Sequence, residues 1–177
     1  METSTPLPID NPFWQFSLRV YAVREAAAEC LELQRVRAVN VNVLLFSSWI
    51  AVSRHIALNA ADIGSIESEI HNWHALAVLP LREIRDRLKS LAEMQHQDVQ
   101  ALRRQVLASE LHAEQIEQAL IFQRAERLSL RQGTGDIRDI LTGNIDLLCS
   151  QALLPKSHET PVSISALIEA SLALAGV

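Results

Sequence analysis

The chain has 177 residues, of which 49% are hydrophobic and 21% charged, and its formal net charge at pH 7 is −5. A chain of this length folds as one domain that buries roughly 70% of its unfolded surface, so neither a disulfide nor a structural metal is needed. The acidic balance excludes a general attraction to nucleic acids or anionic membranes, and we expect neither as a partner.

The first residues and the cysteines indicate the compartment. Residues 1–10, METSTPLPID, have an acid at position 2 and two prolines without an apolar core, which is not the pattern of a signal peptide, and we expect them to be disordered. Cys30 and Cys149 are far apart and form no CxxC motif, so they predict buried thiols rather than a disulfide framework. We therefore expect a cytoplasmic protein without a cofactor.

Two helices are predicted at the start of the chain. The segment NPFWQFSLRVYAV has Asn11 at the N-cap position and Pro12 at the first helical position, which together are a strong start signal. Its aromatic and aliphatic residues then follow at helical spacing. The alanine-rich segment REAAAECLELQRV, which begins at Arg24, predicts the second helix.

The next stretch, AVNVNVLLFSSWIAVSRH at residues 38–55, is the most apolar part of the chain. It begins with the alternation of a strand, but an apolar run with helical spacing soon replaces that pattern. The uncharged run is shorter than the roughly 20 residues that a membrane span needs. We therefore predict a buried helix at about 41–58, capped by Asn40 or Asn42, at the centre of the fold.

Three more helices are predicted in the middle of the chain. Asp62 opens one that runs through Trp73, Pro80 opens another, and residues 96–131 form one long helix without glycine or proline. That long helix would run on the order of 50 Å, whereas a compact domain of this size has a radius of gyration of about 16 Å. It must therefore either pack antiparallel on residues 62–92 or meet another chain.

The last part of the chain adds a helix, a linker and a tail. The segment RQGTGD ends the long helix, and Asp136 begins the next one. Residues 155–161 include two prolines and predict a linker, after which 162–177 form an amphipathic helix. We expect a single helical domain over 11–154. The fold class is all-α, an irregular or orthogonal bundle of roughly seven or eight helices around the central one.

Several blocks of the sequence resemble a known family. In chain order they are NPFWQFSLRVY, CLELQ, VNVLLFSSW, and a tryptophan followed by VLPLREIRDRLK. Together they resemble a proteobacterial family of cytoplasmic proteins that is known only as a domain of unknown function, and the similarity covers about residues 11–125. That family would break the chain with a Pro-Gly pair after Tyr21, where this chain has Val23-Arg24-Glu25. The resemblance implies a helical fold and a bacterial cytoplasmic setting, without an activity or site residues.

The segment IESEIHNWH contains the best candidate for a metal site. On a helix, Glu67, His71 and His74 lie at positions i, i+4 and i+7, so one carboxylate and two imidazoles share a face. Nitrogen and oxygen ligands in this arrangement suit Zn²⁺ or a non-haem iron. The competing interpretation is an ordinary solvated helix face.

The segment LREIRDRLK places Arg82, Arg85 and Lys89 on one stripe of a helix. A basic stripe of this kind can contact an acidic partner or hold a phosphate. The acidic residues within 105–126 offer a second interpretation, in which they face this stripe inside the same chain. The partner-contact role and the internal role both stay open from the sequence.

The sequence contains no GxSxG, Walker or HExxH motif, so it names no catalytic residue. We expect a non-enzymatic interaction or adaptor protein that acts on an unknown protein partner or as a homodimer and is not inserted in a membrane. One alternative is a metal-binding protein or enzyme that uses the glutamate and the two histidines above. Another is a binder of a small apolar ligand, with Trp14, Phe46 and Trp49 lining its pocket.

Overall fold

The computed structural model describes residues 6–92, 96–152 and 162–175. Its helices are α1 (Pro12–Tyr21), α2 (Arg24–Arg37), α3 (Val41–Arg54), α4 (Ala60–Trp73), the π-helical turn η1 (His74–Val78), α5 (Leu79–Ala92), α6 (Gln97–Ala125), α7 (Ile137–Gln151) and α8 (Ser165–Leu172). Because α4, η1 and α5 follow one another without a break, they form one continuous helical segment. Over the described ranges the protein is thus all-α, as predicted, with no strand longer than an isolated bridge.

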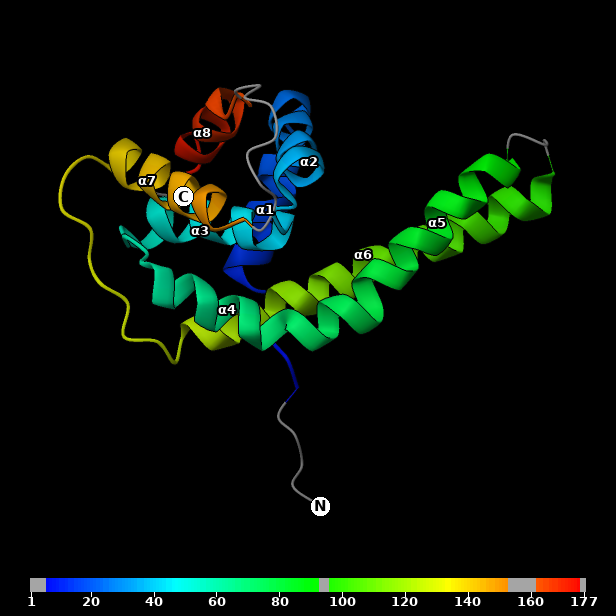
Figure 1. Ribbon diagram of the computed structural model, residues 1–177, viewed down its shortest axis with the longest axis horizontal. Coiled ribbons are helices and arrows are strands. Elements are labelled where there is room, and N and C mark those ends of the chain that lie inside the picture. The colour runs from blue at the N-terminus through cyan, green and yellow to red at the C-terminus, as the bar shows by residue number, and fades with distance from the viewer. Residues whose placement is uncertain (1–5, 93–95, 153–161, 176–177) are drawn as a thin grey trace, which may run out of the picture.

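The predicted central helix is α3. All residues from Val41 to Val52 are buried, and the helix packs against α1, α6 and α7 (Figure 1). Asn40 is its N-cap, since the Asn40 side chain accepts hydrogen bonds from the backbone N–H groups of Asn42 at 2.8 Å and Val43 at 3.4 Å. Across the described ranges, no helix combines the length and the apolar character that a membrane crossing requires.

Aromatic rings fill the centre of the core. The ring centroid of Trp49 lies 5.6 Å from that of Phe13, 5.9 Å from that of Phe46 and 5.7 Å from that of Phe122. The guanidinium of Arg54 lies 5.0 Å from the Trp49 ring centroid, a cation–π distance. These contacts join α1, α3 and α6 in one cluster, because the rings come from all three helices.

The central helix ends at Arg54, earlier than the predicted 58. His55 adopts a left-handed conformation with φ of 56°, and the residues after it pair with 131–133, where the Gly133 N–H donates to the His55 carbonyl at 2.7 Å. A Cβ on Gly133 would lie 2.4 Å from Ile140 Cδ1, so glycine permits this close approach. The left-handed residue and the pairing account for the early end of α3.

The long helix α6 also ends early, at Ala125 instead of about 131. The residues that follow leave the helix, and Leu128 and Leu130 pack against the core before the chain pairs with the end of α3. At 1.5 Å per residue, the 29 residues of α6 span about 43 Å.

Helices α5 and α6 pack together as a hairpin that projects far beyond the other helices (Figure 1). This arrangement confirms the first of the two alternatives for the long helix, in which it packs on the preceding segment of its own chain. We call α5 with the N-terminal half of α6 the arm. We call the remaining helices, with the C-terminal half of α6, the body.

The closing helix α8 docks on the body. Leu167 and Ile168 are buried against the core, and the Glu29 carboxylate on α2 accepts hydrogen bonds from the Leu167 N–H at 2.8 Å and the Ser163 hydroxyl at 2.6 Å. A carboxylate at a helix N-terminus is favourable because the first N–H groups have no partner inside the helix. The predicted linker at 155–161 lies outside the described residues, as do residues 1–5.

Candidate functional site

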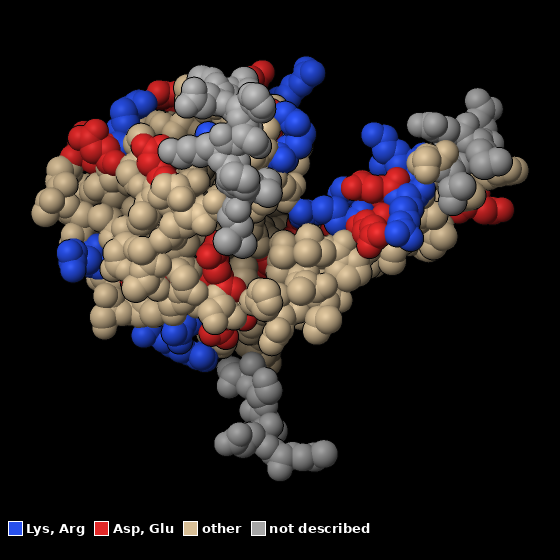
Figure 2. Space-filling view, in the orientation of Figure 1, with Lys and Arg blue, Asp and Glu red and all other residues tan. Residues whose placement is uncertain are grey.

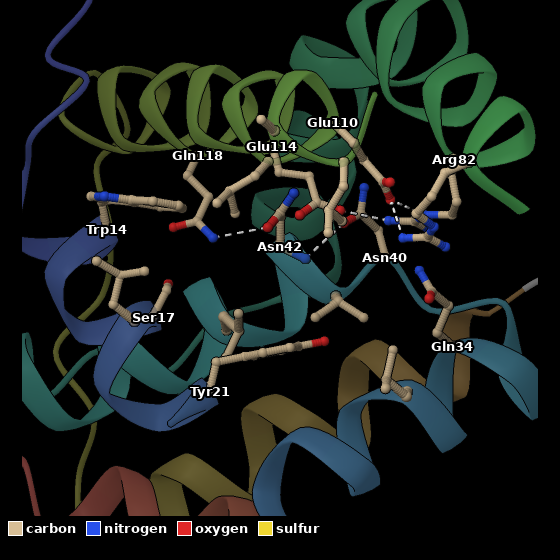
Figure 3. A pocket seen from close by; sticks show the side chains of 18 of the residues that line it. Trp14, Ser17, Tyr21, Gln34, Asn40, Asn42, Arg82, Glu110, Glu114 and Gln118 are labelled. Atoms are coloured by element: carbon tan, nitrogen blue, oxygen red, sulfur yellow. Dashed lines mark hydrogen bonds and ion pairs between the residues drawn. The ribbon is translucent and has the colours of Figure 1, made fainter. Parts of the chain in front are cut away.

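A groove of about 720 Å³ lies where the arm leaves the body, between α1, α2, the start of α3, α5 and α6 (Figure 3). Its apolar lining residues are Trp14, Leu18, Tyr21, Leu31, Val41, Leu45, Leu107, Ala108 and Leu111. Its polar lining residues are Ser17, Gln34, Asn40, Asn42, Arg82, Arg85, Arg104, Glu110, Glu114 and Gln118. We call this site the junction groove. In Figure 2, acidic and basic side chains gather along the arm near the body.

Much of the apolar lining faces solvent. The exposed fractions are 44% for Leu18, 38% for Tyr21, 53% for Leu31, 45% for Leu107 and 51% for Leu111. These residues come from the consecutive helices α1 and α2 and from the distant helix α6, and all of them line the one groove. Soluble proteins rarely leave a contiguous apolar patch uncovered unless something binds there.

Helical periodicity explains why each wall is apolar. On α1, Trp14, Leu18 and Tyr21 lie at positions i, i+4 and i+7, and on α6 Leu107 and Leu111 lie at i and i+4. Residues at these spacings share one helix face. Each of the two helices therefore presents an apolar stripe to the groove.

Charged residues form the wall on the arm side. The Arg82 Nη2 lies 2.8 Å from Glu114 Oε1, and the Arg85 Nη1 lies 2.7 Å from Glu110 Oε1. Arg82 and Arg85 of the predicted basic stripe therefore meet acidic residues of α6 inside the chain, while Lys89 is exposed farther along the arm. A contact of this stripe with an external partner stays a prediction.

An acid and a phenol in the lining of the groove, Glu114 and Tyr21, both have a raised pKa. Burial raises the pKa of the Glu114 carboxyl, the ion pair with Arg82 opposes this, and the nearby carboxylates of Glu110 and Glu117 add to it. Burial is also the main cause that raises the pKa of the Tyr21 phenol to about 12. Tyr21 therefore keeps its proton at neutral pH and stays a hydrogen-bond donor.

Beside the groove, a carboxylate without any exposed surface ties three elements together. Glu117 Oε1 accepts hydrogen bonds from Asn40 Nδ2 at 2.8 Å and from Asn42 Nδ2 at 3.1 Å. Glu117 Oε2 lies 2.8 Å from His74 Nδ1. The start of α3, the π-helical turn η1 and α6 thus meet at one buried acid.

This network fixes the orientation of Gln118. Because the Glu117 carboxylate can only accept, the Asn42 amide turns its nitrogen toward it, and its oxygen then accepts from Gln118 Nε2 at 2.8 Å. Gln118 is left with its Oε1 facing away from Asn42 (Figure 3). Within the described residues, the buried oxygens Gln118 Oε1 and Glu110 Oε2 have no hydrogen-bond partner.

The three candidate metal ligands do not converge. Glu67 and His71 are exposed on α4, whereas His74 belongs to η1 and turns toward Glu117. In the part of the chain that the structure describes, no three His, Cys, Asp or Glu side chains come together as a metal ion would require.

Of the three aromatic residues expected to line a ligand pocket, only Trp14 lines the junction groove, because Phe46 and Trp49 pack in the core. The sequence interpretation grouped Glu110 and Glu117 with the acidic residues of 105–126 but did not predict that they are buried, and it missed Gln118. Their signal was their spacing, since polar residues at i, i+7 and i+8 of a helix share a face. All three are buried on α6, on the face that also carries apolar core residues.

Comparison with known proteins gives one match. No curated protein and no solved structure matches the chain. The family model described as "Protein of unknown function (DUF2390)" matches residues 12–121, which run from α1 into the last turns of α6 and include every residue that lines the junction groove. The chain therefore belongs to this family of proteins of unknown function, DUF2390.

Proposed function

We propose that this protein is a non-enzymatic interaction or adaptor protein, and that it binds an apolar segment of another protein in the junction groove. The observation that carries the proposal is the convergence of five partly exposed apolar side chains on one groove. Covering such a surface removes apolar area from water, which is the main driving force of protein association.

The size of this driving force can be worked out from the exposed fractions. Full burial of a large apolar side chain is worth about 1.5–3 kcal/mol, so covering five that are roughly half exposed gives about 4–7 kcal/mol. Association costs an estimated 4–15 kcal/mol in lost freedom. Apolar contact alone therefore supports only a weak complex, and polar contacts at the groove must add to it.

We place this role in the bacterial cytoplasm. The family resemblance in the sequence supports this setting. Cys30 and Cys149 also support it, because both are free thiols, as expected in a reducing compartment.

A photo-crosslinking amino acid in place of Leu111 tests the proposal in cells of the source organism. Leu102 provides the matched control, since it lies on the same helix with 48% exposure against 51% for Leu111 but does not line the groove. We expect a crosslinked product of defined higher mass from position 111 and not from position 102. Mass spectrometry of that product identifies the partner.

Two outcomes would contradict the proposal. One is the absence of any product from position 111, and the other is the same products from both positions. A crosslink to a second copy of this chain would show that the partner is the same protein and that it acts as a homodimer.

A further inference from the structure

Resting on the proposed function, we propose that the segment bound in the junction groove carries acidic residues at the end that lies toward the tip of the arm. Its carboxylates pair there with Arg104 and Lys89, while its apolar residues cover the leucines of the groove. The tip is the end of the arm where α5 ends and α6 begins. The charges along the groove, from the body to the arm, support this polarity.

Near the body, the charged residues that line the groove are already paired. Arg82 forms its ion pair with Glu114, and Arg85 forms its ion pair with Glu110. Gln34, which faces the groove from the body side, is uncharged (Figure 3). Among the described residues, the lining at this end therefore offers an occupant no unpaired charge.

Beyond these pairs, two cations lie toward the tip. Arg104 is six residues before Glu110 on α6, and Lys89 is one turn after Arg85 on α5 and continues its face. Both are exposed, and within the described ranges neither pairs with an acid. Asp86, the acid nearest to Lys89 in the sequence, contacts Arg85 instead at 2.8 Å. This end of the groove thus carries positive charge that no described side chain neutralises.

Arg104 shares its face of α6 with apolar residues of the groove. Leu107, Ala108 and Leu111 lie three, four and seven residues after it, and all four residues line the groove. From Arg104 to Leu111 the helix rises about 10 Å. One short segment that lies along α6 therefore covers the two leucines and reaches Arg104 with a carboxylate.

Ion pairs at this end supply part of the polar contribution that the apolar contacts lack. An exposed pair of opposite charges strengthens binding by up to about fivefold, and two like charges placed opposite each other weaken it similarly. Exposed charges also steer association, and salt screens them. An acidic occupant should therefore bind faster and more tightly at low ionic strength.

A peptide display library with randomised charged and apolar positions, selected on the full-length protein, tests this inference. We expect the selected peptides to combine an apolar stretch with Asp or Glu at one end. The variants Arg104→Glu and Lys89→Glu should each bind these peptides about 2- to 30-fold more weakly than the wild type, because each loses one ion pair and gains one repulsion.

The variant Arg87→Glu is the matched control. It changes the net charge by the same amount and lies on the arm, but Arg87 does not line the groove and pairs with Glu83. We expect it to bind the selected peptides like the wild type, with circular dichroism to show that all variants are folded. Equal losses in Arg104→Glu and Arg87→Glu would contradict the inference, since only the net charge would then matter.

A charge swap assigns the carboxylate to Arg104. Replacing the acidic residues of a selected peptide by lysine should weaken its binding to the wild type and strengthen its binding to Arg104→Glu. A swapped peptide that binds Arg104→Glu no better than the original peptide does would overturn the assignment.

Two results separate the failure of this inference from the failure of the proposed function. The uncharged substitution Leu111→Gln removes an apolar contact of the groove, and Leu102→Gln is its control outside the lining. Selected peptides that depend on Leu111 but carry no acidic end would overturn the inference and leave the proposed function standing. A selection that returns no peptide dependent on Leu111 would overturn both.

Discussion

Replacing Glu117 by alanine should destabilise the protein strongly, because three donors converge on this buried carboxylate. Asn42 is 6% exposed, so its side-chain nitrogen would be left without a partner, at a cost of about 1–3 kcal/mol. Asn40 and His74 are only partly buried and can turn to water, so each loses the net value of one hydrogen bond, about 0.5–1.5 kcal/mol. The sum is a loss of about 2–6 kcal/mol.

The Glu117→Gln variant is the matched control. Its amide oxygen can still accept from Asn40 and Asn42, while its nitrogen faces the His74 ring, whose neutral form offers an acceptor. It also removes a buried charge, which relieves a desolvation cost. We therefore expect this variant to change the free energy of unfolding by no more than about 1 kcal/mol.

Urea denaturation followed by circular dichroism measures both variants. The slope of the transition should stay unchanged, which allows the midpoints to be compared directly. A loss below about 1 kcal/mol in Glu117→Ala, or equal losses in both variants, would refute this account of the network.

Three further predictions concern buried residues of the body. Trp49→Ala should cost about 3–5 kcal/mol in denaturant titrations because it leaves a cavity among aromatic rings, and a loss under about 1 kcal/mol would contradict its central place. Asn144→Asp should lower the free energy of unfolding by about 3 kcal/mol or more, because it replaces an amide that donates to the Ser47 and Ile56 carbonyls. Thermal melting measures this loss, and an unchanged melting temperature would contradict the prediction. Burial raises the pKa of the Cys30 thiol to about 12, so at pH 8 it should resist iodoacetamide until urea unfolds the chain; rapid native labelling by mass spectrometry would be the contrary result.

Apolar periodicity predicted the helices of the body. The run that became α3 is apolar on nearly all faces, and such a pattern is typical of a helix enclosed on all sides. Its end was missed because the left-handed His55 and the pairing with residues 131–133 depend on a segment far away in the sequence.

Apolar periodicity also predicted α6 as a helix, but it assigned the buried and exposed sides of that helix wrongly. It assigns charged residues to solvent and leucines to the core, but here Glu110 and Glu117 are buried while Leu107 and Leu111 are exposed. A buried carboxylate is stable only when donors surround it, and the donors to Glu117 come from α3 and η1. Partners so distant in sequence do not show in the local pattern from which the helix was predicted.

The π-helical turn η1 sets which face of α5 meets α6. A π-helical turn accommodates one residue more than the α-helical turns on either side, and such insertions are frequent at functional sites. Leu76 within it is 80% exposed and therefore has little packing role of its own. Deleting one residue here would restore an unbroken α-helix and rotate α5 by about 100° about its axis. Arg82 and Arg85 would then turn away from α6 and lose their ion pairs with Glu114 and Glu110. A single inserted residue therefore determines which face of α5 meets α6, and with it the charged wall of the groove.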